Sequence, residues 1–384
     1  MRLQGRALER GEGIEVEIAG GRIVGCRPLA PEACVAPDVW LLPGLFDIQV
    51  NGYAGYDFNG PSASAETVVH AIRALWREGV THLCPTVITA GFEEIATALR
   101  AIGAACADPL IAVSVVGIHL EGPYISPEDG ARGAHPRAHV RPPNWDEFQR
   151  WQEAAGGRIG LVTVAPETPG GLAFIERLAE AGIIPAIGHT AATPAQIREA
   201  IAAGARLSTH LGNGSHAMLP RHANYLWEQA AADELMASLI LDGHHLPPAI
   251  ALCLVRCKGV ERTILISDAM TAAGLPPGRY RLGDAEVEVS PDRRCSLAGT
   301  PYLAGSAIAL RMGVANVVRL AGVSPAQAVS MATAQPARLW GMERRLGRLA
   351  AGGEASLVVA RWQPWVGEIE IMKTVVAGQV VYEQ

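Results

Sequence analysis

Residues 183–210 read IIPAIGHTAATPAQIREAIAAGARLSTH, and this stretch decides the fold. Two short apolar runs, 183–187 and 205–207, each lead within three residues to a histidine, His189 and His210. Apolar runs that end at turn residues are typical of buried strands. The Ala-rich segment 193–203 between them is typical of a helix, with Thr193 as N-cap and Pro194 in its first turn. We therefore expect a strand, a helix and a second strand.

Two strands joined by a helix normally run parallel and lie side by side. Their carboxyl ends then meet at one edge, so His189 and His210 should lie close together. Neutral imidazole is a common metal ligand, and two at one edge suggest a metal site. A purely structural role for the two histidines is the alternative.

The same alternation of apolar run and helix continues on both sides of this unit. Strand-like runs occur at 45–50, 80–87, 112–120, 159–165, 183–187, 206–209, 238–241 and 263–267. Most gaps hold a plausible helix, for example 65–78, 92–106 and 171–181. This pattern predicts an α/β fold, a TIM-like (β/α)₈ barrel. A doubly wound open sheet is the alternative, but no Gly-x-Gly-x-x-Gly follows the first strand.

Both ends of the chain differ from this interior because they are rich in β-prone residues. Such segments lie at 13–18, 22–26, 355–360 and 374–382. We expect a small β-sandwich domain built from residues 1–42 and 346–384. The barrel would then occupy residues 43–345.

Composition excludes several classes of partner. The 384 residues carry a net charge of −6 without a cluster of Lys or Arg, so we expect no nucleic-acid partner. No run of about 18 apolar residues occurs, so we expect no membrane partner. Seven scattered cysteines and the lack of a signal peptide predict a reduced, cytoplasmic protein. Cys253 and Cys257 are interpreted as two buried residues on one helix face.

Polar residues gather where the predicted strands end. In a barrel the chemistry takes place at the carboxyl ends of the strands. Burying this many polar groups at random would cost free energy, so we expect one shared site. The residues at these ends are Gln49, Asn51, Glu121, Glu167, His189, His210, Asp242, His244, His245 and Asp268.

Five of these residues suggest metal-assisted hydrolysis. Glu121, His189 and His210 offer one carboxylate and two imidazoles, which suits Zn²⁺ or another borderline divalent ion with a position open for water. Such an ion acidifies the water and polarises a carbonyl group. Asp268 would take the proton of the water and pass it to the leaving group, with a helix cap as its alternative role. His245 would donate a hydrogen bond to the carbonyl oxygen.

Three further residues have less specific surroundings. His119 lies on the same strand face as Glu121 and is interpreted as a core histidine, with metal ligation as the alternative. His135, in the loop after the third strand, could reach a substrate. Glu167 is interpreted equally well as a solvated loop carboxylate or as a functional one.

Seven short motifs, in order along the chain, resemble those of the N-acetylglucosamine-6-phosphate deacetylase family in the amidohydrolase superfamily. They are PGLFD at 43–47, PTVIT at 85–89, GIHLEGP at 117–123, GHT at 188–190, THL at 209–211, DGHH at 242–245 and SDA at 267–269. Each motif alone is weak evidence. Together they extend the resemblance over essentially the whole chain.

The resemblance implies a barrel with a β-sandwich and hydrolysis of N-acetylglucosamine 6-phosphate to glucosamine 6-phosphate and acetate, usually in a homodimer. It implies that Glu121, His189 and His210 bind the metal, that Asp268 is the catalytic acid and base, and that His245 contacts substrate. Many amidohydrolases carry His-x-His and two metals where residues 49–51 read Gln-Val-Asn. We therefore expect one metal ion per chain, Zn²⁺ in preference to Fe²⁺, Mn²⁺ or Co²⁺.

The resemblance also implies substrate contacts from Asn213, Gly214 and Arg221, the last lent to the phosphate by a neighbouring subunit. A guanidinium suits phosphate because it donates two parallel hydrogen bonds. However, Gly214 and Ser215 stand where the family usually has Ala-Met, and residues 216–229 replace its Gly/Pro-rich segment. Another N-acetylhexosamine phosphate or an N-acyl amino acid therefore stays open as substrate. A third alternative is a barrel without catalytic activity. The presence of Glu121, His189, His210 and Asp268 argues against it, because such a barrel does not need all four.

Overall fold

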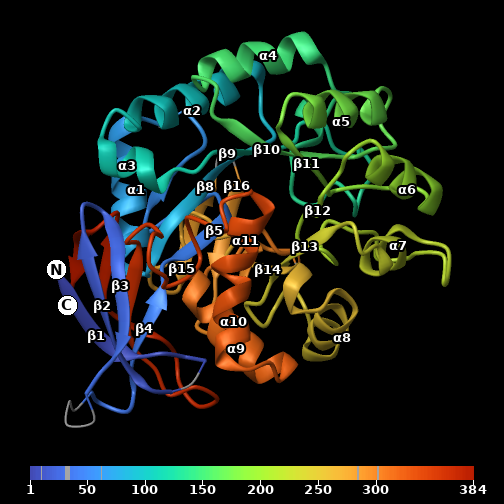
Figure 1. Ribbon diagram of the computed structural model, residues 1–384. Coiled ribbons are helices and arrows are strands. Elements are labelled where there is room, and N and C mark those ends of the chain that lie inside the picture. Colours follow the sequence, from blue (N-terminus) through green and yellow to red (C-terminus); the bar gives the residue numbers. More distant parts are fainter. Residues whose placement is uncertain (10, 31–34, 62, 283–284, 301) are drawn as a thin grey trace.

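A central barrel of eight parallel strands, ringed by helices, forms the body of the molecule (Figure 1). The computed structural model describes residues 1–384 except 10, 31–34, 62, 283–284 and 301. The barrel strands, in order around the sheet, are β5 (Leu45–Val50), β8 (Val80–Ile88), β9 (Ile118–Glu121), β10 (Ile159–Val164), β11 (Ile184–Ile187), β12 (Leu207–Ser208), β13 (Met236–Ile240) and β14 (Thr263–Ile266). The predicted (β/α)₈ barrel is confirmed.

The barrel closes where β14 meets β5. The backbone N–H of Asp268 donates to the carbonyl of Gln49 over 2.9 Å, and the N–H of Asn51 donates to the carbonyl of Ala269 over 2.8 Å. These bonds join the two edge strands, which removes their unpaired edges. They also bring Gln49 and Asn51 beside Asp268, although more than 200 residues separate them along the chain.

Several of the helices that follow the strands begin at residues whose side chains cap them. Thr193 accepts a hydrogen bond from the N–H of Gln196, whose own side chain accepts from the N–H of Thr193. This capping box starts the helix predicted between the two histidines. The helices are α1 (Ala65–Arg77), α2 (Phe92–Ala105), α3 (Pro109–Ser114), α4 (Trp145–Ala154), α5 (Gly171–Glu180), α6 (Pro194–Ala202), α7 (Tyr225–Ala231), α8 (Pro248–Lys258), α9 (Leu310–Ala321), α10 (Pro325–Met331) and α11 (Ala334–Leu339).

One predicted strand, 112–120, is wrong in its first half. Asp108 accepts hydrogen bonds from the N–H groups of Leu110 and Ile111, and Pro109 occupies the first helical position. Both features favour a helix start, so α3 takes residues 109–114 and the strand begins only at Ile118.

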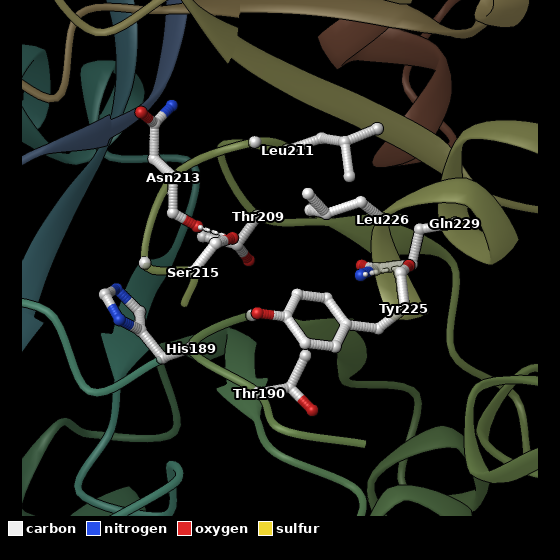
Figure 2. A pocket seen from close by; sticks show the side chains of 12 residues that line it. His189, Thr190, Thr209, Leu211, Asn213, Ser215, Tyr225, Leu226 and Gln229 are labelled. Carbon is white, nitrogen blue, oxygen red and sulfur yellow. Dashed lines mark hydrogen bonds between the residues drawn. The ribbon is translucent and has the colours of Figure 1, made fainter. Parts of the chain in front are cut away.

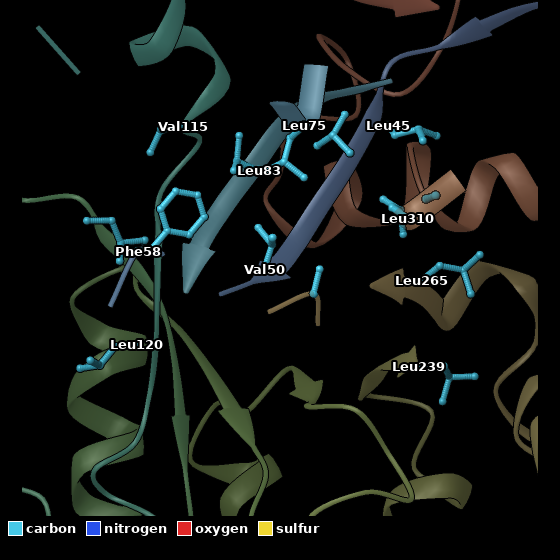
Figure 3. Packing of buried hydrophobic residues seen from close by; sticks show 14 of the residues in the cluster. Leu45, Val50, Phe58, Leu75, Leu83, Val115, Leu120, Leu239, Leu265 and Leu310 are labelled. Atoms are coloured by element: carbon cyan, nitrogen blue, oxygen red, sulfur yellow. The ribbon is translucent and has the colours of Figure 1, made fainter. Parts of the chain in front are cut away.

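Two apolar cores position the strand ends. The larger core lies between the strands and the outer helices, where Leu83 lies beside Leu75 of α1 and Leu265 lies near Leu310 of α9 (Figure 3). The smaller core fills the barrel and includes Phe46, Ile48, Leu161 and Ile264.

Trp340 closes the end of the barrel opposite the carboxyl ends of the strands. A Cβ added at Gly117 would lie 2.5 Å from its ring, and one at Gly160 would lie 2.6 Å away. Glycine at both positions therefore lets the indole pack directly on the backbone that leads into β9 and β10.

A second sheet joins both ends of the chain, as predicted for the small β domain (Figure 1). Its strands are hydrogen-bonded in one sheet, with the order β20-β19-β18-β4-β1-β2-β3. The predicted run 374–382 is two strands, because Ala377 and Gly378 turn the chain with φ of 46° and 81°. The strands are β1 (Arg2–Arg6), β2 (Gly13–Ala19), β3 (Arg22–Pro28), β4 (Val39–Pro43), β18 (Leu357–Arg361), β19 (Glu370–Val376) and β20 (Gln379–Glu383).

Some features differ from the sequence interpretation or were not predicted. After β14 the chain forms a three-stranded antiparallel sheet of β15 (Gly278–Leu282), β16 (Ala285–Val289) and β17 (Cys295–Leu297). Cys253 and Cys257 are exposed, not buried, because α8 turns Leu254 and Val255 towards the core instead. Among the described helices, none has the length and apolar character needed to span a membrane.

Glu354 ties the terminal sheet to the barrel. Its Oε1 accepts from His82 Nε2 of β8 over 2.9 Å and from the hydroxyl of Ser356 over 2.6 Å, and Arg345 donates to its Oε2 over 2.6 Å. Burial alone would raise the pKa of this carboxyl group, but the hydrogen bonds from His82, Ser356 and Arg345 lower it to about 2. The ionised carboxylate is therefore part of the folded structure.

We predict that Glu354→Gln lowers the free energy of unfolding at neutral pH by roughly 3 kcal/mol. Because the folded pKa of Glu354 is depressed, its contribution is complete above about pH 4.5 and is lost as the pH falls towards 2. Denaturant unfolding should thus show that the difference in free energy of unfolding between wild type and Glu354→Gln narrows below pH 4.5. Glu180→Gln on the exposed face of α5 is the control. An equal loss in both variants, or a gap independent of pH, would contradict this role.

Candidate active site

Three side chains converge at the carboxyl ends of β9, β11 and β12. His210 Nε2 lies 2.9 Å and His189 Nε2 lies 3.3 Å from the same oxygen, Oε1 of Glu121. One ligand atom from each residue lies within 4.8 Å of the other two, and all three residues are buried. This is a compact set of one oxygen and two nitrogen donors.

The hydrogen bonds around His189 show which of its nitrogens faces the cluster. Its Nδ1–H donates to the carbonyl of Ala131 over 2.9 Å, so Nε2 is the nitrogen that faces Glu121. Such a bond to the second nitrogen is typical of metal-binding histidines. Although burial opposes ionisation, the hydrogen bonds from His189 and His210 hold the pKa of Glu121 well below its ordinary value. The set therefore offers an ionised carboxylate and imidazole nitrogens, which fit a divalent ion.

The backbone is strained at three residues that follow barrel strands and point into the cluster region. His189, His210 and Asp268 have φ of 48°, 31° and 46°, in the left-handed region that residues other than glycine rarely adopt. Each such residue costs on the order of 1–3 kcal/mol and persists because the surrounding packing holds it. The strain turns these side chains into the mouth of the barrel, where strained residues commonly serve function.

Asp268 is held beside the cluster by two amide side chains. Asn51 Nδ2 donates to Asp268 Oδ1 over 2.8 Å, and Gln49 Nε2 lies 3.4 Å from the same oxygen. Gln49 also donates to Glu121 Oε1 over 2.8 Å, so one amide joins the two carboxylates. Burial, reinforced by the charge of Glu121, raises the pKa of Asp268 to about 6. A carboxyl group with such a pKa can exchange protons near neutral pH.

The two adjacent histidines after β13 have different surroundings. His245 Nδ1 donates to Asp242 Oδ2 over 2.7 Å, and Asp242 Oδ1 accepts from the backbone N–H of both His244 and His245. This carboxylate fixes the imidazole of His245 and leaves its Nε2 free for another partner. His244 instead donates to the carbonyl of Asp292, next to β17.

The three residues with less specific sequence context, His119, His135 and Glu167, have different surroundings in the structure. His135 enters the cluster, with its Nε2 3.3 Å from His189 Nε2, and burial lowers its pKa to about 3. His119 is fully buried, and its Nε2 is paired with Thr163 over 2.8 Å. Glu167 accepts from Thr190 and from the N–H of Ala191, so it supports the loop that follows His189.

A polar pocket adjoins His189 on the side of α7. Figure 2 shows His189 on one side of it and Tyr225, Leu226 and Gln229 of α7 on the other. Asn213 and Gly214 line the pocket, and a Cβ at Gly214 would lie 2.6 Å from His189 Nδ1. Glycine at position 214 therefore allows this loop to pack directly on the imidazole.

Arg221 does not reach this pocket within one chain. It is exposed, as is the neighbouring His222, and no carboxylate among the described residues pairs with its guanidinium. The exposed side chains of Met218 and Trp227 lie in the same segment. The backbone carbonyl of Arg221 accepts from the indole N–H of Trp227 over 3.3 Å.

Comparison with known proteins assigns the family. The sequence profile of the amidohydrolase family matches residues 40–381. The chain belongs to the amidohydrolase family. An N-acetylgalactosamine-6-phosphate deacetylase of Escherichia coli O157:H7 is 35% identical over 90% of this chain and 89% of its own length. An N-acetylglucosamine-6-phosphate deacetylase of Bos taurus is 34% identical over 99% of this chain and 94% of its own.

Solved structures agree with this assignment. The N-acetyl-D-glucosamine-6-phosphate deacetylase of Mycobacterium smegmatis, solved as an aspartate-to-alanine variant in complex with N-acetyl-D-glucosamine-6-phosphate, superposes with a TM-score of 0.88 at 32% identity and covers 99% of both chains. The corresponding Thermotoga maritima enzyme gives 0.86 at 26% identity over the whole of both chains. The amidohydrolase family is metal-dependent, and this chain is a hydrolytic enzyme of that family.

Sequence reasoning missed two residues of the site. Asp242 was noted only as a strand-end carboxylate, yet the spacing of three residues to His245 is a signal for the pair that the structure contains. Thr89, whose hydroxyl pairs with His135 over 2.8 Å, gave no such signal. That contact joins residues 46 positions apart through a loop, so no local pattern indicates it.

We predict that His189→Ala or His210→Ala removes the bound metal, because two remaining ligands cannot hold the ion well. Elemental analysis after purification and dialysis should find about one ion per wild-type chain and close to none in either variant. His70→Ala, at a half-exposed position on α1, should keep the wild-type content. Full metal content in both cluster variants would show that the ion is bound elsewhere.

Proposed function

We propose that this enzyme hydrolyses N-acetylglucosamine 6-phosphate to glucosamine 6-phosphate and acetate, a reaction of amino sugar catabolism. The observation that carries the proposal is the placement of Asp268 beside the Glu121 cluster, with one amide of Gln49 touching both carboxylates. A hydrolase of an acetamido group needs an activated water and a proton carrier close to it. The names of the relatives supply the substrate class.

The metal would be held by Glu121, His189 and His210, and we propose one Zn²⁺ per chain, with Fe²⁺, Mn²⁺ or Co²⁺ as substitutes. A divalent ion there supplies Lewis acidity, which lowers the pKa of a water molecule and polarises the acetyl carbonyl. The amides of Gln49 and Asn51 occupy the positions that carry His-x-His in two-metal amidohydrolases. These amides donate hydrogen bonds to the two carboxylates, whereas imidazoles at these positions would offer ligands to a second cation.

Asp268 would move the proton. Its Oδ1 is held by Asn51, so Oδ2 is the atom that accepts a proton from the attacking water as the new C–O bond forms. The same atom then gives the proton to the sugar nitrogen as the C–N bond breaks, which releases the amine and acetate. One carboxyl group thus serves both halves of the reaction.

Four residues would orient the substrate around these groups. We propose that the Nε2 atoms of His245 and His135 contact the acetamido group, since Asp242 and Thr89 hold their Nδ1 atoms. We further propose that Asn213 and Gly214, which line the pocket beside His189, bind the sugar phosphate.

Arg221 would complete the phosphate site from a second subunit in a homodimer. Its exposure, next to exposed Met218 and Trp227, supports a role outside its own chain. We also propose a cytoplasmic location, as the six described cysteines are all free. The division into residues 1–42 with 346–384 and residues 43–345 likewise remains our proposal, supported by the pairing of β4 with β18.

A second candidate substrate is N-acetylgalactosamine 6-phosphate. The specific observation in its favour is the relative of that activity at 35% identity, together with the unusual segment 216–229 beside the substrate pocket. An N-acyl amino acid and a barrel without catalytic activity are the remaining alternatives.

The direct test is acetate release from a panel of these four substrates: N-acetylglucosamine and N-acetylgalactosamine, each with and without the 6-phosphate. We expect the highest kcat/KM for N-acetylglucosamine 6-phosphate. A preference for the galacto epimer would make N-acetylgalactosamine 6-phosphate the substrate, and the proposed deacetylation would still hold. No release from any of them, with metal present, would refute the proposed function.

We predict that Asp268→Asn keeps the metal but loses turnover. Loss of a general acid or base costs about 10²–10⁴-fold, and more is expected where one group serves both steps. Acetate release and metal content measured on one preparation test this prediction. Loss of metal, with activity restored by added metal, would make Asp268 a ligand instead.

We predict that Arg221→Ala raises KM for the phosphorylated sugar by about ten- to a hundredfold, since a charge-assisted hydrogen bond contributes 1.5–3 kcal/mol. Turnover of the unphosphorylated sugar should stay as in wild type, because that substrate lacks the contact. Arg73→Ala, an exposed arginine on α1, should change neither. An equal effect on both sugars would exclude a phosphate contact.

A further inference from the structure

Thr89 lies between two parts of the site that the proposed reaction uses. It directly follows β8, which ends at Ile88, and its residue is 2% exposed. Its hydroxyl oxygen lies 2.8 Å from His135 Nδ1 and 3.4 Å from the backbone carbonyl of Glu121, to which the hydroxyl donates. One side chain thus joins a metal-cluster residue to the loop histidine.

These contacts decide how the ring of His135 is oriented. A hydroxyl group donates one hydrogen bond and accepts others, so Thr89 can pair with Nδ1 while it is bound to Glu121. Because Nδ1 is held there, Nε2 of His135 points the other way, into the cluster, 3.3 Å from His189 Nε2. The two imidazole rings meet edge to face, with centroids 4.4 Å apart and an interplanar angle of 77°.

The backbone leaves room for this hydroxyl. A Cβ added at Gly122, directly after Glu121, would lie 2.1 Å from Thr89 Oγ1. Gly122 also has φ of +78°, where side chains are disfavoured. A glycine at this position is therefore required for Thr89 to reach Glu121 and His135 together.

We propose that Thr89 is a positioning residue that acts through His135, holding His135 Nε2 towards the acetamido group of the substrate. This inference rests on the proposed deacetylase function. The hydroxyl of Thr89 bonds to the His135 ring and to the backbone carbonyl of Glu121, not to a proposed metal-ligand atom. Its effect on the reaction should therefore pass entirely through the orientation of His135.

The activity test compares Thr89→Val, which is nearly isosteric but has no hydroxyl, with Thr89→Ser, which keeps it. Loss of the hydrogen bond should lower kcat roughly two- to tenfold in Thr89→Val, with KM and metal content close to wild type. Thr89→Ser should restore kcat, and Thr97→Val on α2 should leave it unchanged. If Thr89→Ser behaves as Thr89→Val does, or if Thr89→Val loses metal, the proposed role is wrong.

A double-mutant cycle with His135→Ala identifies the route of the effect. If Thr89 acts through His135, adding Thr89→Val to His135→Ala should cause no further loss of kcat. An undiminished loss in that background would mean that Thr89 acts through Glu121 or through general packing, and would overturn the proposal.

A measurement that does not depend on turnover tests the role of Thr89 independently of the proposed function. In protein with ¹⁵N-labelled histidine, the His135 signals, assigned by their absence in His135→Ala, should show two well-separated nitrogen shifts in wild type and Thr89→Ser. Thr89→Val should give averaged shifts, because nothing then fixes the tautomer and the ring orientation. Identical His135 shifts in all three proteins would refute the positioning role, whether or not acetate is released.

Discussion

The site depends on a single buried oxygen atom, Oε1 of Glu121. Two imidazole nitrogens and one amide nitrogen lie within 3.3 Å of it, from His189, His210 and Gln49. A buried carboxylate costs several kcal/mol unless charge or hydrogen bonds compensate it. The fold provides that compensation from three other strand ends, so the geometry of the cluster and the closure of the barrel stabilise each other.

Loops that follow the strands connect the Glu121 cluster to the region where substrate would bind. The carbonyl of Ala131 orients His189, and Gly133 and Gly214 pack against the same ring from two loops. The loop of Gly133 also carries His135, and the loop of Gly214 leads to Tyr225 and α7. Changes in either loop would therefore alter the orientation of a cluster histidine as well as the surface that meets the sugar.

The sequence predicted the features that depend on local pattern. Alternating apolar runs and helices indicated the barrel, and the position of Glu121, His189, His210 and Asp268 at strand ends indicated where the polar side chains gather. Thr193 and Pro194 predicted the start of α6 for the same local reason.

Features that depend on contacts distant in sequence were not predictable in this way. The pairing of Thr89 with His135 and the support that Asn51 gives to Asp268 arise only when the barrel closes. The short sheet β15–β17 was missed because its strands are brief and pair with one another in a sheet of their own. The helix at 109–114 could have been read from Asp108 and Pro109, but the apolar residues that follow favoured a strand.

The proposed site holds one divalent ion between Glu121, His189 and His210, with the amides of Gln49 and Asn51 in place of a second metal. Anomalous diffraction at the absorption edge of the bound metal tests it most directly. One strong peak per chain is expected, about 2.0–2.2 Å from a Glu121 oxygen and from Nε2 of both histidines. A second peak of equal height beside Gln49 and Asn51, or a single peak away from Glu121, would contradict it.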